Sequence, residues 1–89
     1  MIEFEIVIVN SKGMHARASA KFVEKVEAFD AKCEVTKDGI TVSGASIMGL
    51  LMLAASKGSL ISVKTWGNDS QLLVDALTIL INNNFEEES

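Results

Sequence analysis

Apolar and polar residues alternate at the start of the chain, from Ile2 to Val9. Because successive side chains of a strand point to opposite faces, this period of two predicts a strand with one buried face. The alternation returns on both sides of Asp38-Gly39, a dipeptide that favours a hairpin because glycine accepts the positive φ of a tight turn. A further strand is predicted from Leu60 to Trp66.

Apolar residues at intervals of three and four replace this alternation in residues 16–29, which predicts an amphipathic helix. Residues 47–55 are apolar nearly all round and form a second predicted helix. Ser46 is placed to be its N-cap, and Gly58 is the expected C′ residue at its end.

A last helix is predicted between caps supplied by residues 68–70 and a stop at residues 82–84. Its expected buried stripe consists of Leu72, Leu73, Ala76, Leu77 and Leu80. The resulting order, β-α-β-β-α-β-α, predicts an open-faced sandwich in which helices cover one face of a sheet. The hairpin makes at least part of that sheet antiparallel.

The composition limits the classes of function. The 89 residues are expected to form one domain over residues 1–85, followed by an acidic tail at residues 86–89 that frays into solvent. A net charge of −4 argues against a nucleic-acid partner. The chain lacks a long apolar run and a basic-apolar leader, which favours a cytoplasmic location without a membrane partner.

The chain has one cysteine, Cys33, and one histidine, His15. It therefore cannot form an internal disulfide, and it cannot build a zinc site from its own cysteine and histidine side chains. Neither a metal nor another cofactor is expected.

His15 lies where a turn leads into the first predicted helix, within Gly13-Met14-His15-Ala16-Arg17. At a helix start the backbone N–H groups lack intrahelical partners and the helix dipole is positive. An anion held there meets free donors, and Arg17 offers a planar set of donors to phosphate oxygens. The same field disfavours the imidazolium cation, so that the ring keeps an unprotonated nitrogen that can act as a nucleophile.

Each candidate residue also has a simpler interpretation. His15 could be a capping or loop histidine without chemistry, and its position alone does not separate the two. Ser46 is either a simple N-cap or a site of regulatory phosphorylation, which would add negative charge at a helix N-terminus. The apolar helix after it is core by default, but a short surface helix buries one side only. Some of its flexible side chains are therefore expected to be exposed for docking.

Separated segments of the chain resemble the HPr family, the histidine-containing phosphocarriers of the phosphoenolpyruvate phosphotransferase system. Residues 13–23, GMHARASAKFV, are similar to the family's active-site segment. Residues 46–54, SIMGLLMLA, are similar to the segment around its regulatory serine, and Lys57-Gly58 follows at the family's usual spacing. The resemblance extends to about Phe85.

The resemblance implies an α+β fold, with a four-stranded antiparallel sheet and three helices on one side. It implies that His15 accepts a phosphoryl group on Nδ1 from enzyme I, which takes it from phosphoenolpyruvate, and donates it to an enzyme IIA domain. Arg17 and the backbone amides of Ala16 and Arg17 would stabilise the phosphoryl group. Ser46 would be modified by HPr kinase/phosphorylase.

The resemblance also implies a docking patch shared by these partners. It would consist of Met14, Ile47, Met48, Leu51 and Met52, with Leu50, Leu53 and Ala54 left for the core. Because each transfer takes place within a complex, the chain would be a carrier rather than a stand-alone enzyme. A monomer would suit a carrier that exposes one face to successive partners.

Some residues depart from the family's usual pattern. Ala18 stands where proline is usual, and it keeps an N–H that proline lacks. Glu24 and Glu27 lie among the lysines of the first predicted helix, which weakens attraction to an acidic partner surface. These differences favour a nitrogen-type or regulatory branch over sugar uptake. The alternatives are a regulatory binding module controlled by Ser46 phosphorylation and a small ligand-binding or assembly domain.

Overall fold

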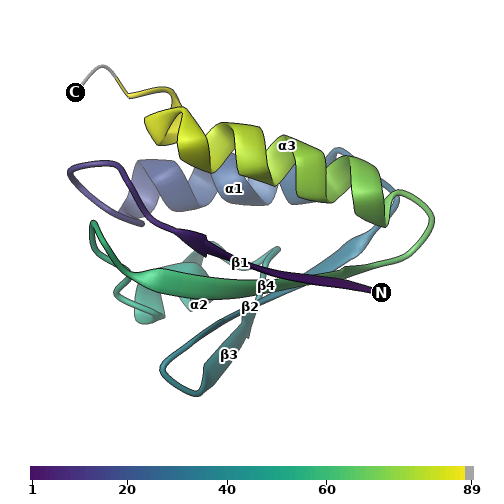
Figure 1. Cartoon of the computed structure of the whole chain (residues 1–89), viewed down its shortest axis with the longest axis horizontal. Helices are drawn as coiled ribbons and strands as arrows, with labels where there is room; N and C mark the ends of the chain where they lie inside the picture. Colours follow the sequence, from purple (N-terminus) through teal and green to yellow (C-terminus); the bar gives the residue numbers. More distant parts are fainter. Residues whose placement is uncertain (88–89) are drawn as a thin grey trace.

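Figure 1 shows the computed structural model, which describes residues 1–87; the β2-β3 hairpin interrupts an otherwise regular alternation of strands and helices. In chain order the elements are β1 (Ile2–Val7), α1 (Ala16–Glu27), β2 (Lys32–Lys37), β3 (Ile40–Ser43), α2 (Ile47–Met52), β4 (Leu60–Trp66), α3 (Ser70–Asn82) and the 3₁₀ turn η1 (Asn84–Glu86). The bounds of β4 agree with the prediction. The first strand ends at Val7 rather than Val9, and the first helix ends at Glu27 rather than at residue 29.

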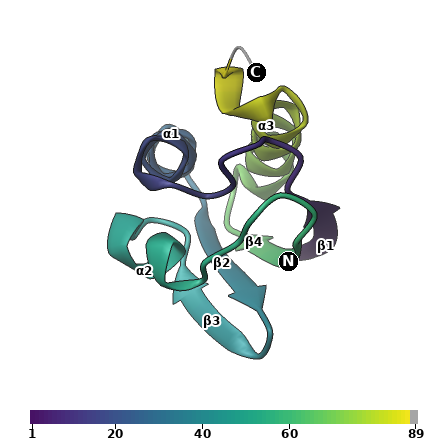
Figure 2. The same cartoon turned by 90° about the vertical axis from the view of Figure 1, so that its left-hand side faces the viewer.

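The strands form one antiparallel four-stranded sheet in the order β1-β4-β2-β3. Figures 1 and 2 show α1 and α3 side by side over one face, and α2 packs against α1 and β3. On the open face, Lys64 of β4 pairs in register with Glu3 of β1 and Glu34 of β2, so that opposite charges are neighbours across the strands. The predicted open-faced sandwich is confirmed.

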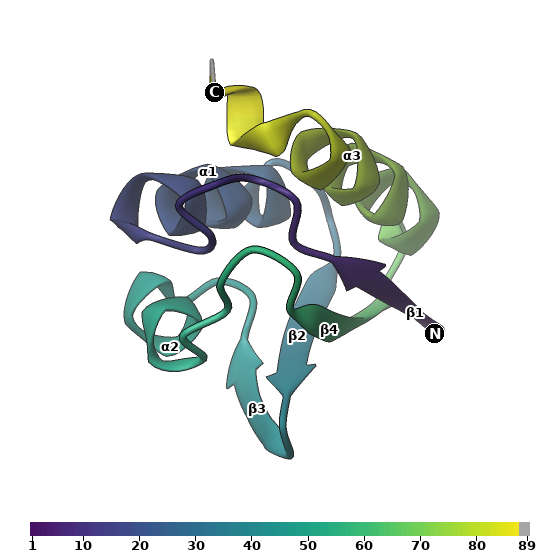
Figure 3. The ribbon, with the colours of Figure 1, turned by 60° about the vertical axis from the view of Figure 1, so that its left-hand side comes forward.

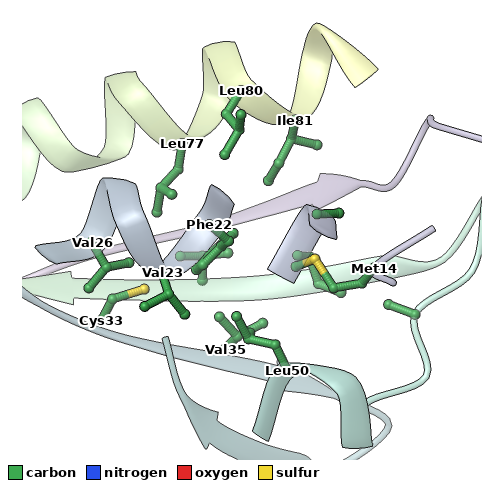
Figure 4. Packing of buried hydrophobic residues seen from close by; sticks show 14 of the residues in the cluster. Met14, Phe22, Val23, Val26, Cys33, Val35, Leu50, Leu77, Leu80 and Ile81 are labelled. Carbon is green, nitrogen blue, oxygen red and sulfur yellow. The ribbon is translucent and has the colours of Figure 1, made fainter. Parts of the chain in front are cut away.

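The core fills the space between the sheet and the helices (Figure 4). Phe22 of α1 and Leu77 of α3 are fully buried, and they share the cluster with Val35 of β2. Leu50 anchors α2 to the same cluster, and Met14 enters it from the loop before α1. Burying an apolar side chain of this size stabilises the fold by about 1.5–3 kcal/mol.

α2 is shorter than the predicted helix of residues 47–55. The chain leaves the helix through Ala54, which has a left-handed φ of 52° and is exposed, although the resemblance to the family implied a core position for it. The next residue, Ala55, is buried, and its carbonyl accepts the N–H of Met14 at 2.8 Å. The helix thus ends early because Ala55 has to reach the loop that precedes α1.

Other local predictions were wrong because tertiary contacts take over these residues. Gly58 is not the C′ residue of α2 but lies in the turn before β4, where its N–H donates to the Ile8 carbonyl at 2.7 Å. Asp69 is the N-cap of α3, yet its carboxylate accepts the backbone N–H of Asp30 at 2.9 Å and caps nothing. Leu72, which was expected in the buried stripe of α3, is 55% exposed, and the core position at this turn of the helix is filled by Leu73, which is fully buried.

Glycines at two turns adopt the left-handed backbone for different reasons. Gly39 (φ 81°) follows Asp38 (φ 51°) at the tip of the predicted hairpin, and a Cβ there would meet nothing within 4 Å. Gly13 (φ 65°) lies just before α1, and a Cβ there would stand 2.5 Å from the Ala55 carbonyl oxygen. Only a residue without a side chain allows the entrance of α1 to approach the backbone after α2 so closely.

This difference predicts that Gly13→Ala destabilises the fold more than Gly39→Ala. Both variants place an alanine in the left-handed region, at a cost of about 1–2 kcal/mol. Gly13→Ala also forces a backbone clash, which adds about 1–3 kcal/mol. Urea denaturation of both variants measures the difference in free energy of unfolding, and equal losses would contradict the close approach at Gly13.

Candidate functional site

His15 is the N-cap residue of α1, with an extended backbone at φ −74° and ψ −178°. Its Nδ1 accepts a hydrogen bond from the backbone N–H of Arg17 at 3.3 Å, as cap side chains do with an early helical amide. Its carbonyl accepts the N–H of Ser19 at 2.8 Å. The Nδ1 hydrogen bond holds the ring in one orientation. The side chain is 26% exposed, so the ring is still accessible to solvent.

Buried polar contacts fix the loop that carries the histidine. Asn10 is fully buried, and its side-chain amide donates to the Gly13 carbonyl at 2.8 Å. The Met14 N–H donates to the Ala55 carbonyl at 2.8 Å, and the Ser19 hydroxyl donates to the Met14 carbonyl at 3.2 Å. The loop is therefore tied both to α1 and to the segment that follows α2.

The C-terminal segment returns to this loop, and Figures 2 and 3 show the turn after α3 beside the connection from β1 to α1. Because Nδ1 of His15 accepts, the ring proton lies on Nε2, which donates to Oε2 of Glu87. Oε1 of Glu87 accepts a second bond from Asn10 Nδ2 at 3.2 Å. The expected fraying is thus wrong for Glu86 and Glu87, while residues 88 and 89 lie outside the described residues.

Residues 84–87, which we call the C-terminal hook, have an unusual backbone. Asn84, Phe85 and Glu86 have left-handed φ values of 57°, 54° and 64°. Each such residue costs on the order of 1–3 kcal/mol, so the surroundings must compensate. Phe85 is fully buried, and its carbonyl accepts a hydrogen bond from Lys21 Nζ at 2.8 Å. These contacts direct Glu87 toward the histidine.

The contacts of Glu87 lower the pKa of its carboxyl below the usual range. The largest cause is the hydrogen bond from His15, which desolvation opposes; the Asn10 hydrogen bond and nearby positive charge, including that of Lys12, add to the lowering. Glu87 is therefore a carboxylate at neutral pH and acts as an acceptor toward the ring.

Arg17 lies in the exposed first turn of α1. Across residues 1–87 its guanidinium takes part in no ion pair, so its donors are free for an anion. The backbone N–H groups of Ala16 and Ala18 lack intrahelical acceptors because they belong to the same first turn. The start of the helix thus brings together the predicted histidine, arginine and amide donors.

Most side chains predicted for docking lie on the surface of α2. Ile47, Met48 and Met52 are 40%, 69% and 71% exposed, and Leu51 is half-buried. Met14 is a correction, since it is 4% exposed and its side chain packs in the core (Figure 4). Figure 3 shows α2 beneath the N-terminal end of α1, so these apolar side chains belong to a helix that adjoins the end carrying the histidine.

Ser46 is the N-cap of α2, and its Oγ accepts the Gly49 N–H at 2.9 Å. Its capping role is confirmed. Cys33 is buried, and burial, with a smaller effect of Glu34, raises the pKa of its thiol to about 12. Cys33 therefore does not compete with the histidine as a nucleophile. The described part of the chain contains no cluster of His, Cys, Asp and Glu side chains that could hold a metal.

Comparison with known proteins assigns the family. The family model described as the PTS HPr component phosphorylation site matches residues 2–83. The chain belongs to the HPr family. A phosphocarrier protein HPr from Neisseria meningitidis is 47% identical over 87 residues, which are 98% of each chain. A phosphocarrier protein NPr from Shewanella violacea is 34% identical over 88 residues, covering 99% of this chain and 97% of the relative.

Solved HPr structures share the fold. The crystal structure of HPr-C-His from Thermoanaerobacter tengcongensis has a TM-score of 0.94 at 37% identity, and the match covers 100% of both chains. Membership of the HPr family makes this chain a phosphocarrier of the phosphotransferase system. None of the helices within residues 1–87 has the length and hydropathy to span a bilayer.

The lowered pKa of Glu87 predicts how the C-terminal hook responds to acid. The folded-state pKa lies below the ordinary value of 4.5, so the contacts stabilise the fold above that pH and lose this contribution as the pH falls through the folded pKa. Glu87→Gln is therefore expected to destabilise the protein at neutral pH and to differ progressively less from the parent below about pH 4.5.

Urea denaturation at a series of pH values measures this difference. Glu86→Gln is the matched control, because Glu86 is 64% exposed and pairs with Lys21 at 3.5 Å, away from the ring. If the difference in free energy of unfolding between Glu87→Gln and the parent stayed constant down to acid pH, the contacts of the Glu87 carboxylate would not stabilise the C-terminal hook.

Proposed function

We propose that this chain accepts a phosphoryl group from enzyme I on Nδ1 of His15 and donates it to an enzyme IIA domain. The observation that carries the proposal is the hydrogen bonding of the two nitrogens of the His15 ring. Its proton lies on Nε2, and Nδ1 presents a lone pair at the start of α1. A neutral imidazole of this kind needs no separate base to act as a nucleophile.

The first turn of α1 supplies the donors for the phosphoryl oxygens. When Nδ1 bonds to phosphorus, the Arg17 N–H loses its ring acceptor and becomes available to an oxygen on the new group. The Ala16 N–H is a second free donor, and the positive end of the helix dipole favours the added charge. The Arg17 guanidinium, which is exposed, would close over the group from the solvent side.

Partner proteins would dock on the exposed side chains of α2, namely Ile47, Met48 and Met52 with part of Leu51. Flexible apolar side chains suit a surface that fits more than one partner. We place this exchange in the cytoplasm and take the carrier to be a monomer, since one face serves both donor and acceptor.

The choice between a sugar-uptake and a nitrogen-type branch rests on few residues. Ala18 and the acidic residues of α1 favour the nitrogen type, whereas the relative named HPr is more similar in sequence than the one named NPr. Phosphoryl transfer to IIA proteins of both types, measured side by side, would decide between the branches.

His15→Ala is expected to abolish phosphoryl acceptance, because the Ser19 hydroxyl in the first turn of α1 is buried and bonded to the Met14 carbonyl. Incubation with enzyme I and labelled phosphoenolpyruvate should give the parent an adduct that is labile in acid and stable in alkali, as expected for a phosphorus–nitrogen bond. Arg17→Ala should keep the adduct and slow its formation about 10–100-fold, the loss of one charge-assisted hydrogen bond.

Lys25→Ala is a suitable control, since this half-buried cation lies in the last turn of the same helix, at the end away from the histidine. It should accept the phosphoryl group at close to the parent's rate. The same adduct on His15→Ala would disprove the assignment of the acceptor.

A second function, regulation through Ser46, is favoured by its place at the N-terminus of α2 beside the exposed Ile47 and Met48. A phosphate there would add about −1.5 to −2 charges next to the docking surface without a large change in fold. We expect HPr kinase/phosphorylase to label the parent and Ser43→Ala, and not Ser46→Ala. Equal incorporation by Ser46→Ala would rule out this site.

A further inference from the structure

The C-terminal hook places a carboxylate on the edge of the imidazole opposite the proposed phosphoryl acceptor. The Glu87 carboxylate accepts a hydrogen bond from the Nε2–H of His15, while Nδ1 accepts a hydrogen bond from the backbone N–H of Arg17. These hydrogen bonds have opposite sense, so together they select one tautomer and one ring orientation. Neither bond obstructs the other, since the ring nitrogens point in different directions.

Several contacts show that Glu87 is held in this place. Its side chain is only 9% exposed, although it lies near the end of the chain. Asn10, itself fully buried, donates to the second carboxylate oxygen at 3.2 Å. The hook behind it is fastened by the buried Phe85 ring and by the Lys21 ammonium on the Phe85 carbonyl. The left-handed backbone of residues 84–86 is thus maintained where it directs this one carboxylate.

We propose that Glu87 is a positioning residue for phosphoryl transfer, which keeps the His15 proton on Nε2 and compensates the charge that the ring gains. The proposal rests on the proposed function, that is, on His15 as the phosphoryl acceptor. Carboxylates that accept the far N–H of a reacting or metal-bound imidazole act in the same way in other proteins, by fixing the tautomer and the ring.

The balance of the step explains what the carboxylate contributes. The Nδ1 lone pair forms a bond to phosphorus, and the bond from phosphorus to the donor breaks with its electron pair on the donor. The proton on Nε2 stays in place, so a neutral imidazole becomes a positively charged ring that bears the phosphoryl group. Glu87 faces that charge through the Nε2–H. The reverse step, transfer onward, returns the electron pair to Nδ1 and leaves the same tautomer ready.

The test compares Glu87→Ala, Glu87→Gln and the control Glu86→Gln in the full-length chain. Single-turnover transfer from phosphorylated enzyme I is measured over a range of enzyme I concentrations, so that the rate at saturation is separated from binding. Glu87→Ala should lower the saturated rate about 10–100-fold, as loss of such a partner does elsewhere. Glu87→Gln keeps an acceptor oxygen without the charge and should lie between Glu87→Ala and the parent. Glu86→Gln should match the parent.

Nitrogen and proton NMR of the His15 ring gives a second readout, which a merely structural role would not move in this way. The parent should show a proton on Nε2 that exchanges slowly with water and an unprotonated Nδ1. Glu87→Ala should lose the slow exchange, and Glu87→Gln should retain part of it. Circular dichroism and urea denaturation of the same samples confirm that each variant is folded.

The possible outcomes separate this proposal from the proposed function. If the parent accepts no phosphoryl group from enzyme I, the proposed function fails and this proposal fails with it. If the parent accepts the group and Glu87→Ala does so at the same saturated rate, only the role of Glu87 is overturned. The role of Glu87 is also overturned if Glu86→Gln slows transfer equally, or if Glu87→Ala changes binding alone, since the tail would then act on docking.

Discussion

The hydrogen bond from the Arg17 amide to Nδ1 of His15 ties the chemistry of the ring to the start of α1. Together with the Glu87 carboxylate on Nε2, this backbone N–H selects which ring nitrogen keeps its lone pair and where that lone pair points. In the proposed function the same N–H is released when the lone pair bonds to phosphorus, so the cap and the proposed anion site are two states of one helix terminus. The buried contacts of the preceding loop keep this terminus in place.

Buried residues hold the start of α1 in this position. Asn10 and Met14 are buried on the segment leading to the histidine, and Gly13 allows this segment to lie against the carbonyl of Ala55. The loop thereby links α1 to α2, whose exposed side chains are the proposed docking surface. A small domain has little room for an enclosed pocket, so in the proposed function it presents His15 at an accessible edge and leaves enclosure to the partner protein.

The C-terminal hook contains an unfavourable left-handed backbone that places Glu87 beside the histidine. A left-handed run of residues other than glycine is unfavourable by itself, and the burial of Phe85 with the Lys21 hydrogen bond offsets it. The product of this arrangement is a carboxylate against the far side of the ring. Its ionisation and its contact with His15 are mutually dependent, because the same hydrogen bond that orients the ring also lowers the carboxyl pKa.

The sequence by itself determined the order of the elements, the Asp38-Gly39 hairpin, the Ser46 cap, and His15 as the candidate acceptor at a helix start, because periodicity, turn chemistry and capping act over a few residues. Contacts between distant segments decided the rest. Ala55 ended α2 early by bonding to the loop before α1, and the core took Met14 away from the surface. Glu87 met the histidine across 72 positions of sequence, which no local pattern encodes. Only the packing of α3 and Phe85 against the rest of the chain fixed where that last carboxylate would lie.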